Sequence, residues 1–364
     1  MVNICAHLTL IGPCIGYLVL AGSNLSLLVC DYISTPLAIA LCTAVLWPHV
    51  WLPTLTEVAV LSAFNVLVAA WLIVVVIVEA VRSDPHAAAS IIAANATDPS
   101  SCAAQASNLD TTFLNMGLEW WYAFPAFATS FACHPVLPSV YEEMREKEKY
   151  SKVVWFVFPM IGVIYATLGV VGYQEYGSCV QAPIYWNVAP GIGRLSAIVL
   201  ISVHVLLTFC IVGFASEKAM GDWLLDIAEA RMERRASEGE DSAKTQLSPG
   251  QTKLIMVAGK TLVVAMCCAF ACIVPDFEGV FGLVGSLPVA MSTFILPCTF
   301  NIKLYGDEMS TASKLGNGAT ILFGVLGAVF GTIASVIGIV KFFTEKQDPI
   351  SYPTYCPDPT KGGW

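Results

Sequence analysis

Nine long apolar runs constrain the fold of this chain more than any other feature of its sequence. A helix needs about 20 mostly apolar residues to cross the hydrocarbon core of a bilayer. Each run is too long for a strand, and the alternation typical of a membrane barrel is missing, so we expect an all-α, polytopic membrane protein. The nine expected spans lie near residues 8–30, 37–50, 58–81, 121–140, 153–173, 193–215, 254–274, 280–304 and 318–342.

The composition supports a membrane protein and excludes other classes. Of the 364 residues, 56% are hydrophobic and only 12% are charged, whereas an average soluble domain has about 25% charged residues. The net charge of −9 and the lack of a dense basic stripe exclude a nucleic-acid partner, which leaves the lipid bilayer as the expected surroundings. Gly324, Gly327 and Gly331 form a small-residue face, which we expect to pack closely against other helices.

Lys and Arg residues in the short loops indicate which ends of the spans face the cytosol. These cations gather in Arg145–Lys152, in the loop 216–253 and again before the last run. We therefore expect 216–253 to be a cytosolic loop, and we place the loop 82–116 and the tail 343–364 outside. The charges do not distinguish the plasma membrane from a vacuolar or lysosomal membrane.

The expected external loops contain sites of covalent modification. Asn95-Ala96-Thr97 is an N-glycosylation sequence, and its external position makes Asn95 a candidate glycosylation site. Cys102 lies in the same loop and Cys179 in the next external one. An oxidising compartment would favour a disulfide between them, and the alternative is two free thiols.

No motif in the sequence indicates an enzyme. The zinc-binding H-E-x-x-H and nucleophile G-x-S-x-G patterns are absent. Gly259-Lys260-Thr261 lacks the first glycine of a phosphate-binding loop, because that position is Leu254. The five histidines show no ligand spacing, so we expect neither a metal site nor an organic cofactor.

The fourth run, 121–140, is irregular because it contains Pro125, Pro135 and Pro138. Each proline removes a backbone hydrogen bond and frees a carbonyl. Broken helices at membrane depth supply substrate and ion sites in transporters. Two interpretations remain open: a substrate-binding broken helix, or an ordinary kinked helix with an interfacial aromatic belt at Trp120–Tyr122.

Ionisable and hydroxyl side chains inside the runs are candidate ion-coupling groups. His204 lies in the middle of its run, and Thr208 follows four residues later on the same helix face. The Thr208 hydroxyl could coordinate a cation, or it could donate a hydrogen bond to a carbonyl of its own helix. His134 lies toward the cytosolic end of its run, where it is either functional or interfacial.

Three further patches occur in a characteristic order and spacing. They are Phe131-Ala132-Cys133-His134-Pro135 followed by Leu137-Pro138-Ser139-Val140-Tyr141-Glu142-Glu143-Met144; Gly172-Tyr173 with Tyr176-Gly177; and Val274-Pro275-Asp276-Phe277 with Leu283-Val284-Gly285-Ser286 and Phe294-Ile295-Leu296-Pro297. They resemble the sixth, the seventh, and the ninth and tenth helices of the amino acid/auxin permease family. Within this family, the residue patterns are most similar to those of the sodium-coupled neutral amino acid transporter branch. The resemblance extends across nearly the whole chain.

The resemblance implies a LeuT-type fold of eleven helices with an inverted repeat. The nine runs would be helices three to eleven, so we expect a LeuT-type fold lacking its first two helices and a chain truncated before Met1. The family's glycosylated external loop and its disulfide between external loops would fall on Asn95 and on Cys102 with Cys179. Thr208 approximately matches the position of a sodium-coordinating threonine in the family.

The sequence therefore predicts a secondary active amino acid transporter that works by alternating access. The resemblance implies that the sixth-helix equivalent unwinds at Phe127, Ala128, Thr129 and Ser130, and that these residues bind the amino acid substrate. The coupling ion would be sodium or a proton. The alternative is a transporter-like sensor or an inactive fragment, whereas a channel is disfavoured because the sequence offers no ring of acidic residues.

Overall fold

The computed structural model describes residues 2–51, 58–82, 119–176, 182–189, 191–237 and 247–344, and within them every regular element is a helix. The longer helices are α1 (Val2–Leu28), α2 (Thr35–Leu46), α3 (Val58–Arg82), α5 (Glu119–Ser130), α6 (Leu137–Glu143), α7 (Tyr150–Tyr176), α8 (Ile192–Ser237), α9 (Pro249–Ile273), α10 (Phe277–Val284), α11 (Leu296–Tyr305) and α12 (Thr311–Thr344). Short 3₁₀ segments are η1 (Trp47–Trp51), η3 (His134–Val136), η4 (Lys147–Lys149) and η6 (Ile184–Trp186), while η8 (Gly285–Val289) and η9 (Met291–Ile295) are π-helical.

Six helical segments are long and apolar enough to cross a membrane. They are Ile4–Leu28, Lys147–Tyr176, Ile192–Arg234, Pro249–Ile273, Phe277–Tyr305 and Thr311–Thr344. The expected spans 37–50 and 58–81 coincide with the shorter apolar helices Thr35–Trp51 and Ala63–Glu79, and the expected span 121–140 is broken. The all-helical, multi-pass character is thus confirmed, whereas the number of nine spans and the LeuT-type fold stay predictions.

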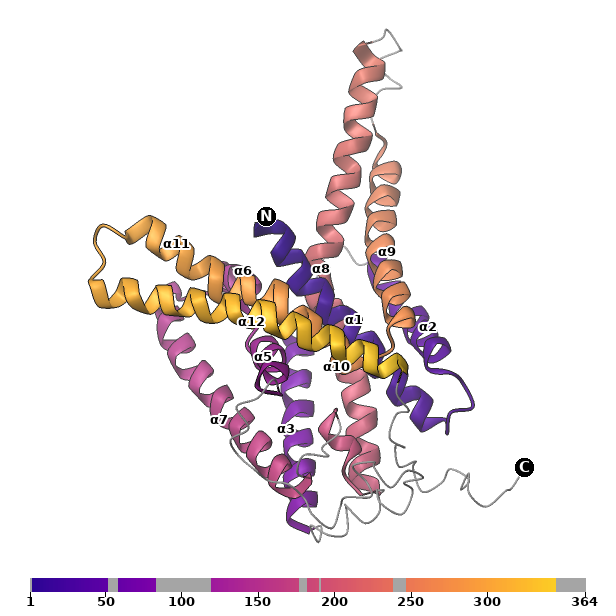
Figure 1. Cartoon of the computed structure of the whole chain (residues 1–364). Helices are drawn as coiled ribbons and strands as arrows, with labels where there is room; N and C mark the ends of the chain where they lie inside the picture. The colour runs from indigo at the N-terminus through magenta and orange to yellow at the C-terminus, as the bar shows by residue number, and fades with distance from the viewer. Residues whose placement is uncertain are drawn as a thin grey trace.

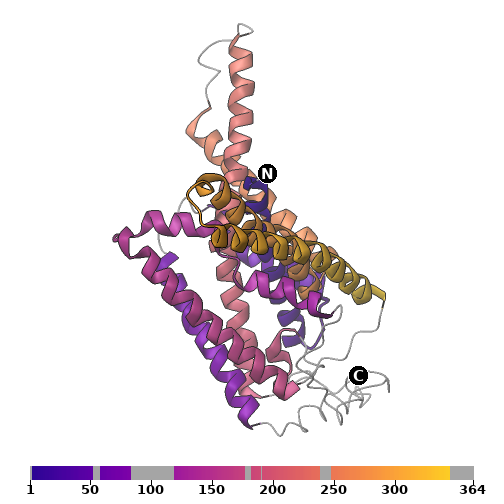
Figure 2. The same cartoon turned by 60° about the vertical axis from the view of Figure 1, so that its left-hand side comes forward.

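The centre of the fold is α1, which packs against α2, α8, α9 and α10 (Figure 1; Figure 2). Leu18 of α1, Ile39 of α2, Phe209 of α8 and Val264 of α9 meet in one buried apolar cluster. Gly22 lets α1 approach α2 closely, because a Cβ atom there would lie 2.9 Å from the backbone nitrogen of Ile39. This packing fixes α1 on several sides and gives its polar side chains defined neighbours.

The small-residue face expected on α12 is confirmed. A Cβ atom on Gly327 would overlap the ring of Phe124 on α5, and one on Gly331 would lie 3.0 Å from the Pro125 ring. A Cβ atom on Gly324 would lie 2.8 Å from the Cβ atom of Phe294 on η9. The glycines therefore allow α12 to hold α5 and the π-helical segments in close contact.

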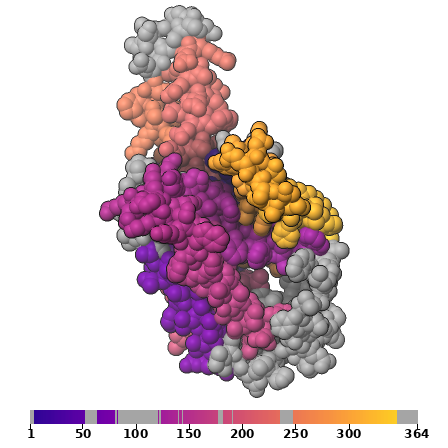
Figure 3. Space-filling model, turned by 90° about the vertical axis from the view of Figure 1, so that its left-hand side faces the viewer, coloured from indigo at the N-terminus to yellow at the C-terminus, as the bar shows by residue number. Residues whose placement is uncertain are grey.

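The helix α7 lies at the outside of the molecule, where it packs along α3. Figure 3 shows it crossing the face of the molecule that is turned toward the viewer. Its large side chains Trp155, Phe156 and Val163 are exposed. Lipid tails solvate such apolar surface as well as another helix does, so this face suits contact with the bilayer.

The helix α8 continues far beyond the expected span 193–215. The predicted cytosolic loop 216–253 is helical as far as Ser237, and α9 begins at Pro249, where Ser248 and Gln251 form a capping box. The expected loop is therefore helical at both ends, and its cytosolic position stays a prediction. The residues after 215 are charged but include many strong helix formers, namely Ala, Leu, Met, Glu and Arg, so the apolar run ends while the helix continues.

Candidate functional site

The fourth run breaks between α5 and α6, at Phe131–Cys133. Pro135 has no amide hydrogen to donate to the Phe131 carbonyl, four residues earlier, so the regular helix cannot continue. The Cys133 amide donates to that carbonyl instead, with an N···O distance of 2.9 Å. The irregularity expected from the prolines is thus present, although the break begins just after Phe127–Ser130, which form the last turn of α5.

The four residues predicted to bind substrate point in different directions. Ala128 is completely buried and packs with Phe124. The Thr129 hydroxyl donates to the Phe281 carbonyl of α10 at 3.5 Å. Phe127 and Ser130 are exposed, and the Ser130 hydroxyl donates to a carbonyl of its own helix. Of these four side chains, Thr129 hydrogen-bonds to a neighbouring helix, and Ala128 joins α5 to its neighbours through apolar packing.

The helix that faces α5 is itself irregular, because α10 passes into the π-helical segments η8 and η9. Such π-turns occur frequently at functional sites. Gly285 opens the first of them, and a Cβ atom there would overlap the carbonyl oxygen of Pro125. Only glycine fits this close approach, so two irregular helices meet with their backbones in contact.

Polar side-chain atoms gather near this meeting point. The Thr9 and Ser292 hydroxyls lie 3.2 Å apart and join α1 to η9. η3 packs against both α1 and η9. The Nδ1 atom of His134 and the Oγ1 atom of Thr293 are buried and have no hydrogen-bond partner among the described residues. Thr293 was not identified from the sequence, since a threonine in an apolar run gives no signal by itself.

Of the two predicted ion-coupling residues on α8, Thr208 contacts α3. The Thr208 hydroxyl donates to the His204 carbonyl at 2.7 Å, which is the bond within one helix that the sequence left open. Its oxygen also accepts from the Asn65 amide nitrogen at 3.0 Å. The Oδ1 atom of Asn65 and the Nδ1 atom of His204 are buried without a hydrogen-bond partner in the described part of the chain. Sequence reasoning did not identify Asn65, because it lies 143 residues from Thr208.

A second polar cluster lies nearer the start of α8 and is fully hydrogen-bonded. The Asn24 amide nitrogen donates to the Tyr185 hydroxyl at 2.9 Å and to the Ser202 hydroxyl at 3.0 Å. Its oxygen accepts from the Trp186 indole at 3.1 Å. These four side chains, which we call the Asn24 network, join α1, η6 and α8 without any charge.

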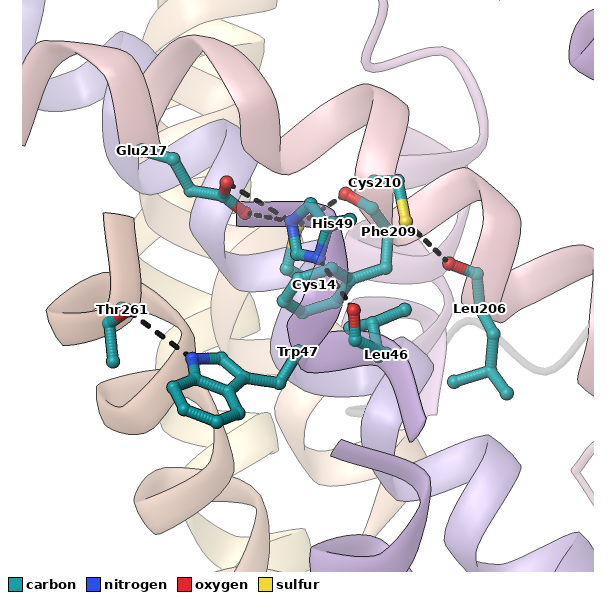
Figure 4. Close-up of polar contacts among 9 residues, drawn as sticks. All are labelled: Cys14, Leu46, Trp47, His49, Leu206, Phe209, Cys210, Glu217 and Thr261. Carbon is teal, nitrogen blue, oxygen red and sulfur yellow. Dashed lines mark hydrogen bonds and ion pairs between the residues drawn. The ribbon is translucent and has the colours of Figure 1, made fainter. Parts of the chain in front are cut away.

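An ion pair occupies a third position on α8 and was also missed from the sequence (Figure 4). The Nε2 atom of His49 on η1 lies 2.9 Å and 3.1 Å from the two carboxylate oxygens of Glu217. The Nδ1 atom of His49 lies 2.9 Å from the Leu46 carbonyl oxygen. The Glu217 side chain is completely buried and that of His49 is 8% exposed. The sequence places Glu217 in the expected cytosolic loop 216–253, where a carboxylate gives no signal of burial.

Some predicted sites fall outside the described residues. Asn95, Cys102 and Cys179 lie there, so the sugar and the disulfide stay predictions. Within the described ranges, no group of three or more His, Cys, Asp or Glu side chains could hold a metal ion.

Comparisons with known proteins identify relatives in Arabidopsis thaliana. Amino acid transporter AVT3C is 30% identical over 201 residues, which cover 55% of this chain and 40% of that relative. Amino acid transporter ANT1 is 23% identical over 218 residues, covering 60% of this chain and 47% of the relative. Amino acid transporter AVT3B is 26% identical over 355 residues, covering 94% of this chain and 75% of the relative. The chain thus spans less than half the length of the first two relatives.

The relatives are named as transporters rather than enzymes, in agreement with the lack of enzyme motifs. A family model described as transmembrane amino acid transporter protein matches residues 1–337, which is nearly the whole chain. The chain therefore belongs to the transmembrane amino acid transporter family.

Proposed function

We propose that the protein is a secondary active transporter that carries an amino acid across its membrane by alternating access, driven by a sodium or proton gradient. The break between α5 and α6, packed against the π-helical segments η8 and η9, carries this proposal. Irregular backbone at membrane depth is tolerated where it lines a cavity, and transporters bind their substrates there. The printed names of the relatives support an amino acid as the cargo.

The groups near the break suit both ends of an α-amino acid. The carbonyls at the C-terminal end of α5 form the negative end of the helix dipole and favour an ammonium. The Thr293 hydroxyl can donate to a carboxylate, and His134 Nδ1 can donate or accept according to its tautomer. Both atoms are buried without a partner among the described residues, so a substrate that binds both would remove two desolvation penalties.

The contact between α3 and α8 supports an ion site. Hard cations prefer oxygen ligands, and the Oδ1 atom of Asn65 and the hydroxyl oxygen of Thr208 lie on neighbouring side chains. His204, one helical turn earlier, offers a proton acceptor instead. We therefore assign the coupling ion to this contact between α3 and α8. The ion is either sodium, bound by the oxygens of Asn65 and Thr208, or a proton, bound by His204.

Uptake into proteoliposomes tests the proposed function. We expect the purified chain to accumulate a radiolabelled amino acid above its external concentration when an inward sodium or proton gradient is imposed. We expect Thr293→Val to raise KM more than it lowers the maximal rate, because the hydroxyl contacts substrate. Binding of amino acids without any flux would contradict the proposal and favour the sensor.

A matched pair of variants tests the ion site. Thr208 and Thr167 both donate to a carbonyl of their own helix, at 2.7 Å and 2.8 Å, but only Thr208 also accepts from Asn65. We expect Thr208→Val to weaken the dependence of uptake on the driving ion, and Thr167→Val to leave it unchanged. Equal ion dependence in the two variants would exclude Thr208 as a ligand.

A further inference from the structure

The hydrogen bonds of His49 fix how many protons its contact with Glu217 can hold. A backbone carbonyl only accepts hydrogen bonds, so the Nδ1 atom that contacts the Leu46 carbonyl must carry a hydrogen. The other ring nitrogen, Nε2, contacts both carboxylate oxygens of Glu217. Either Nε2 carries a proton and Glu217 is ionised, or Nε2 accepts a proton from a neutral Glu217 carboxyl. Both arrangements contain one proton between the two side chains.

Loss of that proton makes the contact repulsive. Nε2 then presents a lone pair to a carboxylate, which can only accept hydrogen bonds. The lone pair faces the two carboxylate oxygens, which lie 2.9 Å and 3.1 Å from Nε2. The completely buried carboxylate also loses its hydrogen-bond donor and the positive charge of the imidazolium, and breaking a buried ion pair in this way is costly. The two side chains can avoid this cost only by separating or by admitting water.

We propose that His49 and Glu217 form a binding site for a single proton, which holds η1 against α8 when it is bound and releases η1 when it is lost. The site is distinct from the break in α5 and from the contact of Asn65 with Thr208, so it goes beyond the proposed transport function.

The surroundings of the pair allow the proton to leave. Other titratable groups reach the pair or its neighbours from three helices: His7 and Cys14 on α1, Cys210, Lys218 and Asp222 on α8, and Lys260 and Cys267 on α9. Lys260 supplies positive charge from the α9 side, with its ammonium 4.7 Å from the centre of the Phe214 ring. A nearby cation stabilises the ionised carboxylate, so the site is not restricted to its protonated form.

The second contact of η1 indicates how the release would occur. The Trp47 indole donates to the Thr261 hydroxyl of α9 at 3.2 Å. Neither group gains or loses a proton near neutral pH, so this bond does not depend on pH. Trp47 and His49 belong to the same short segment, so their side chains hydrogen-bond η1 to α9 and to α8 respectively (Figure 4). Loss of the proton breaks the hydrogen bond between His49 and Glu217, while the bond of Trp47 to α9 stays. Within the described part of the chain, the other contact of the His49 ring with α8 is its edge against the ring of Phe209, so η1 is then held to α8 through apolar contact and can turn about its attachment to α9.

Nitrogen NMR of the whole chain tests whether the proton is shared. The protein is labelled with ¹⁵N-histidine, placed in lipid nanodiscs and titrated with pH, and the His49 signals are assigned with His49→Gln. We expect both ring nitrogens of His49 to change with a single midpoint. We expect Glu217→Gln, which keeps the shape but cannot ionise, to reduce the proton affinity of His49 about tenfold or more, and Glu217→Asp to restore part of it.

Hydrogen exchange of the η1 amides tests the release. After correction for the intrinsic effect of pH, we expect protection of Trp47–Trp51 to fall across the His49 midpoint. The uncharged segment Ile184–Trp186 provides the internal control and should show no such step. Glu217→Gln should abolish the step, because its amide cannot lose a proton.

Three outcomes would overturn the proposal. A His49 midpoint that is the same in wild type and Glu217→Gln would show that no proton is shared. A His49 that stays doubly protonated throughout the titration would make the contact a permanent ion pair. If His49 titrates while the hydrogen-exchange protection of the η1 amides stays constant, the proton does not hold η1 against α8. None of these readouts uses amino acid uptake, so failure of the proposed transport function would leave this test intact.

Discussion

Ser202 and Glu217 lie on the same helix, 15 residues apart, or about 22 Å, yet they join α8 to its neighbours in different ways. Ser202 belongs to the Asn24 network, in which hydroxyl, amide and indole groups meet. Glu217 forms an ion pair with His49, and each of its carboxylate oxygens contacts the same ring nitrogen. The Asn24 network is uncharged and its polar groups are hydrogen-bonded, whereas the contact of His49 with Glu217 depends on a bound proton.

The difference predicts that pH acts on only one of the two clusters. Burial raises the pKa of the Tyr185 hydroxyl, and a group with a raised folded-state pKa keeps its full contribution to stability at every pH below its unfolded value. That value is about 10 for tyrosine, so the Asn24 network is insensitive to pH from 5 to 8. Histidine, by contrast, is the side-chain type whose ordinary pKa of about 6.5 lies inside that range, so we expect the contact between His49 and Glu217 to depend on pH.

The largest expected effect comes from removing one partner of the ion pair. Glu217→Ala leaves His49 Nε2 and its neighbours without the carboxylate, and breaking a buried pair in this way costs about 3–5 kcal/mol. Thermal unfolding in detergent measures the loss. Asp226→Ala, an exposed position on the same helix, is the matched control. A loss no greater than that of the control would show that the pair contributes little to stability.

A smaller effect is expected from the Asn24 network. Asn24→Ala leaves the Tyr185, Trp186 and Ser202 groups without their shared partner, and an unsatisfied buried polar group costs about 1–3 kcal/mol. The same unfolding assay, repeated at pH 5, 6, 7 and 8, should give one constant loss. A loss that changed across this series would show that the network contains a titrating group.

The smallest effect comes from crowding the ion pair without removing it. A Cβ atom on Gly213 would lie 3.1 Å from a carboxylate oxygen of Glu217 and 3.4 Å from the Cys14 sulfur. We expect Gly213→Ala to destabilise the protein by about 1 kcal/mol and to shift the titration midpoint of His49. Gly169→Ala on α7 is the control, because nothing lies within 4 Å of its Cβ position. An unchanged midpoint in Gly213→Ala would show that the carboxylate has room to move.

The sequence was sufficient to predict the features that follow from local chemistry. Apolar runs predicted an all-helical membrane protein, and the structure contains six helical segments of sufficient length and hydropathy. The prolines of the fourth run predicted an irregular helix, and the spacing of Gly324, Gly327 and Gly331 predicted the close packing of α12. Each prediction rests on backbone or steric properties of residues that are close together in the chain.

The polar sites depended on contacts between distant residues, which one sequence does not show. His49 and Glu217 are 168 residues apart, and Asn65 and Thr208 are 143 apart. Hydropathy placed the end of the sixth run before Glu217, because a scale of single residues cannot tell a paired, buried carboxylate from a solvated one. The same limit explains why the expected loop 216–253 is partly helix.

The unbroken length of α8 has a mechanical consequence. Its 46 residues amount to about 69 Å of helix, more than twice the roughly 30 Å hydrocarbon thickness of a bilayer, and no proline interrupts them. Such a rod behaves as one rigid body. The helix α1 lies along it from Ser202, which contacts Asn24, to Ser216, which contacts His7, and α9 packs beside it as well. A displacement at Ser202 is therefore transmitted to Glu217 without an intervening joint.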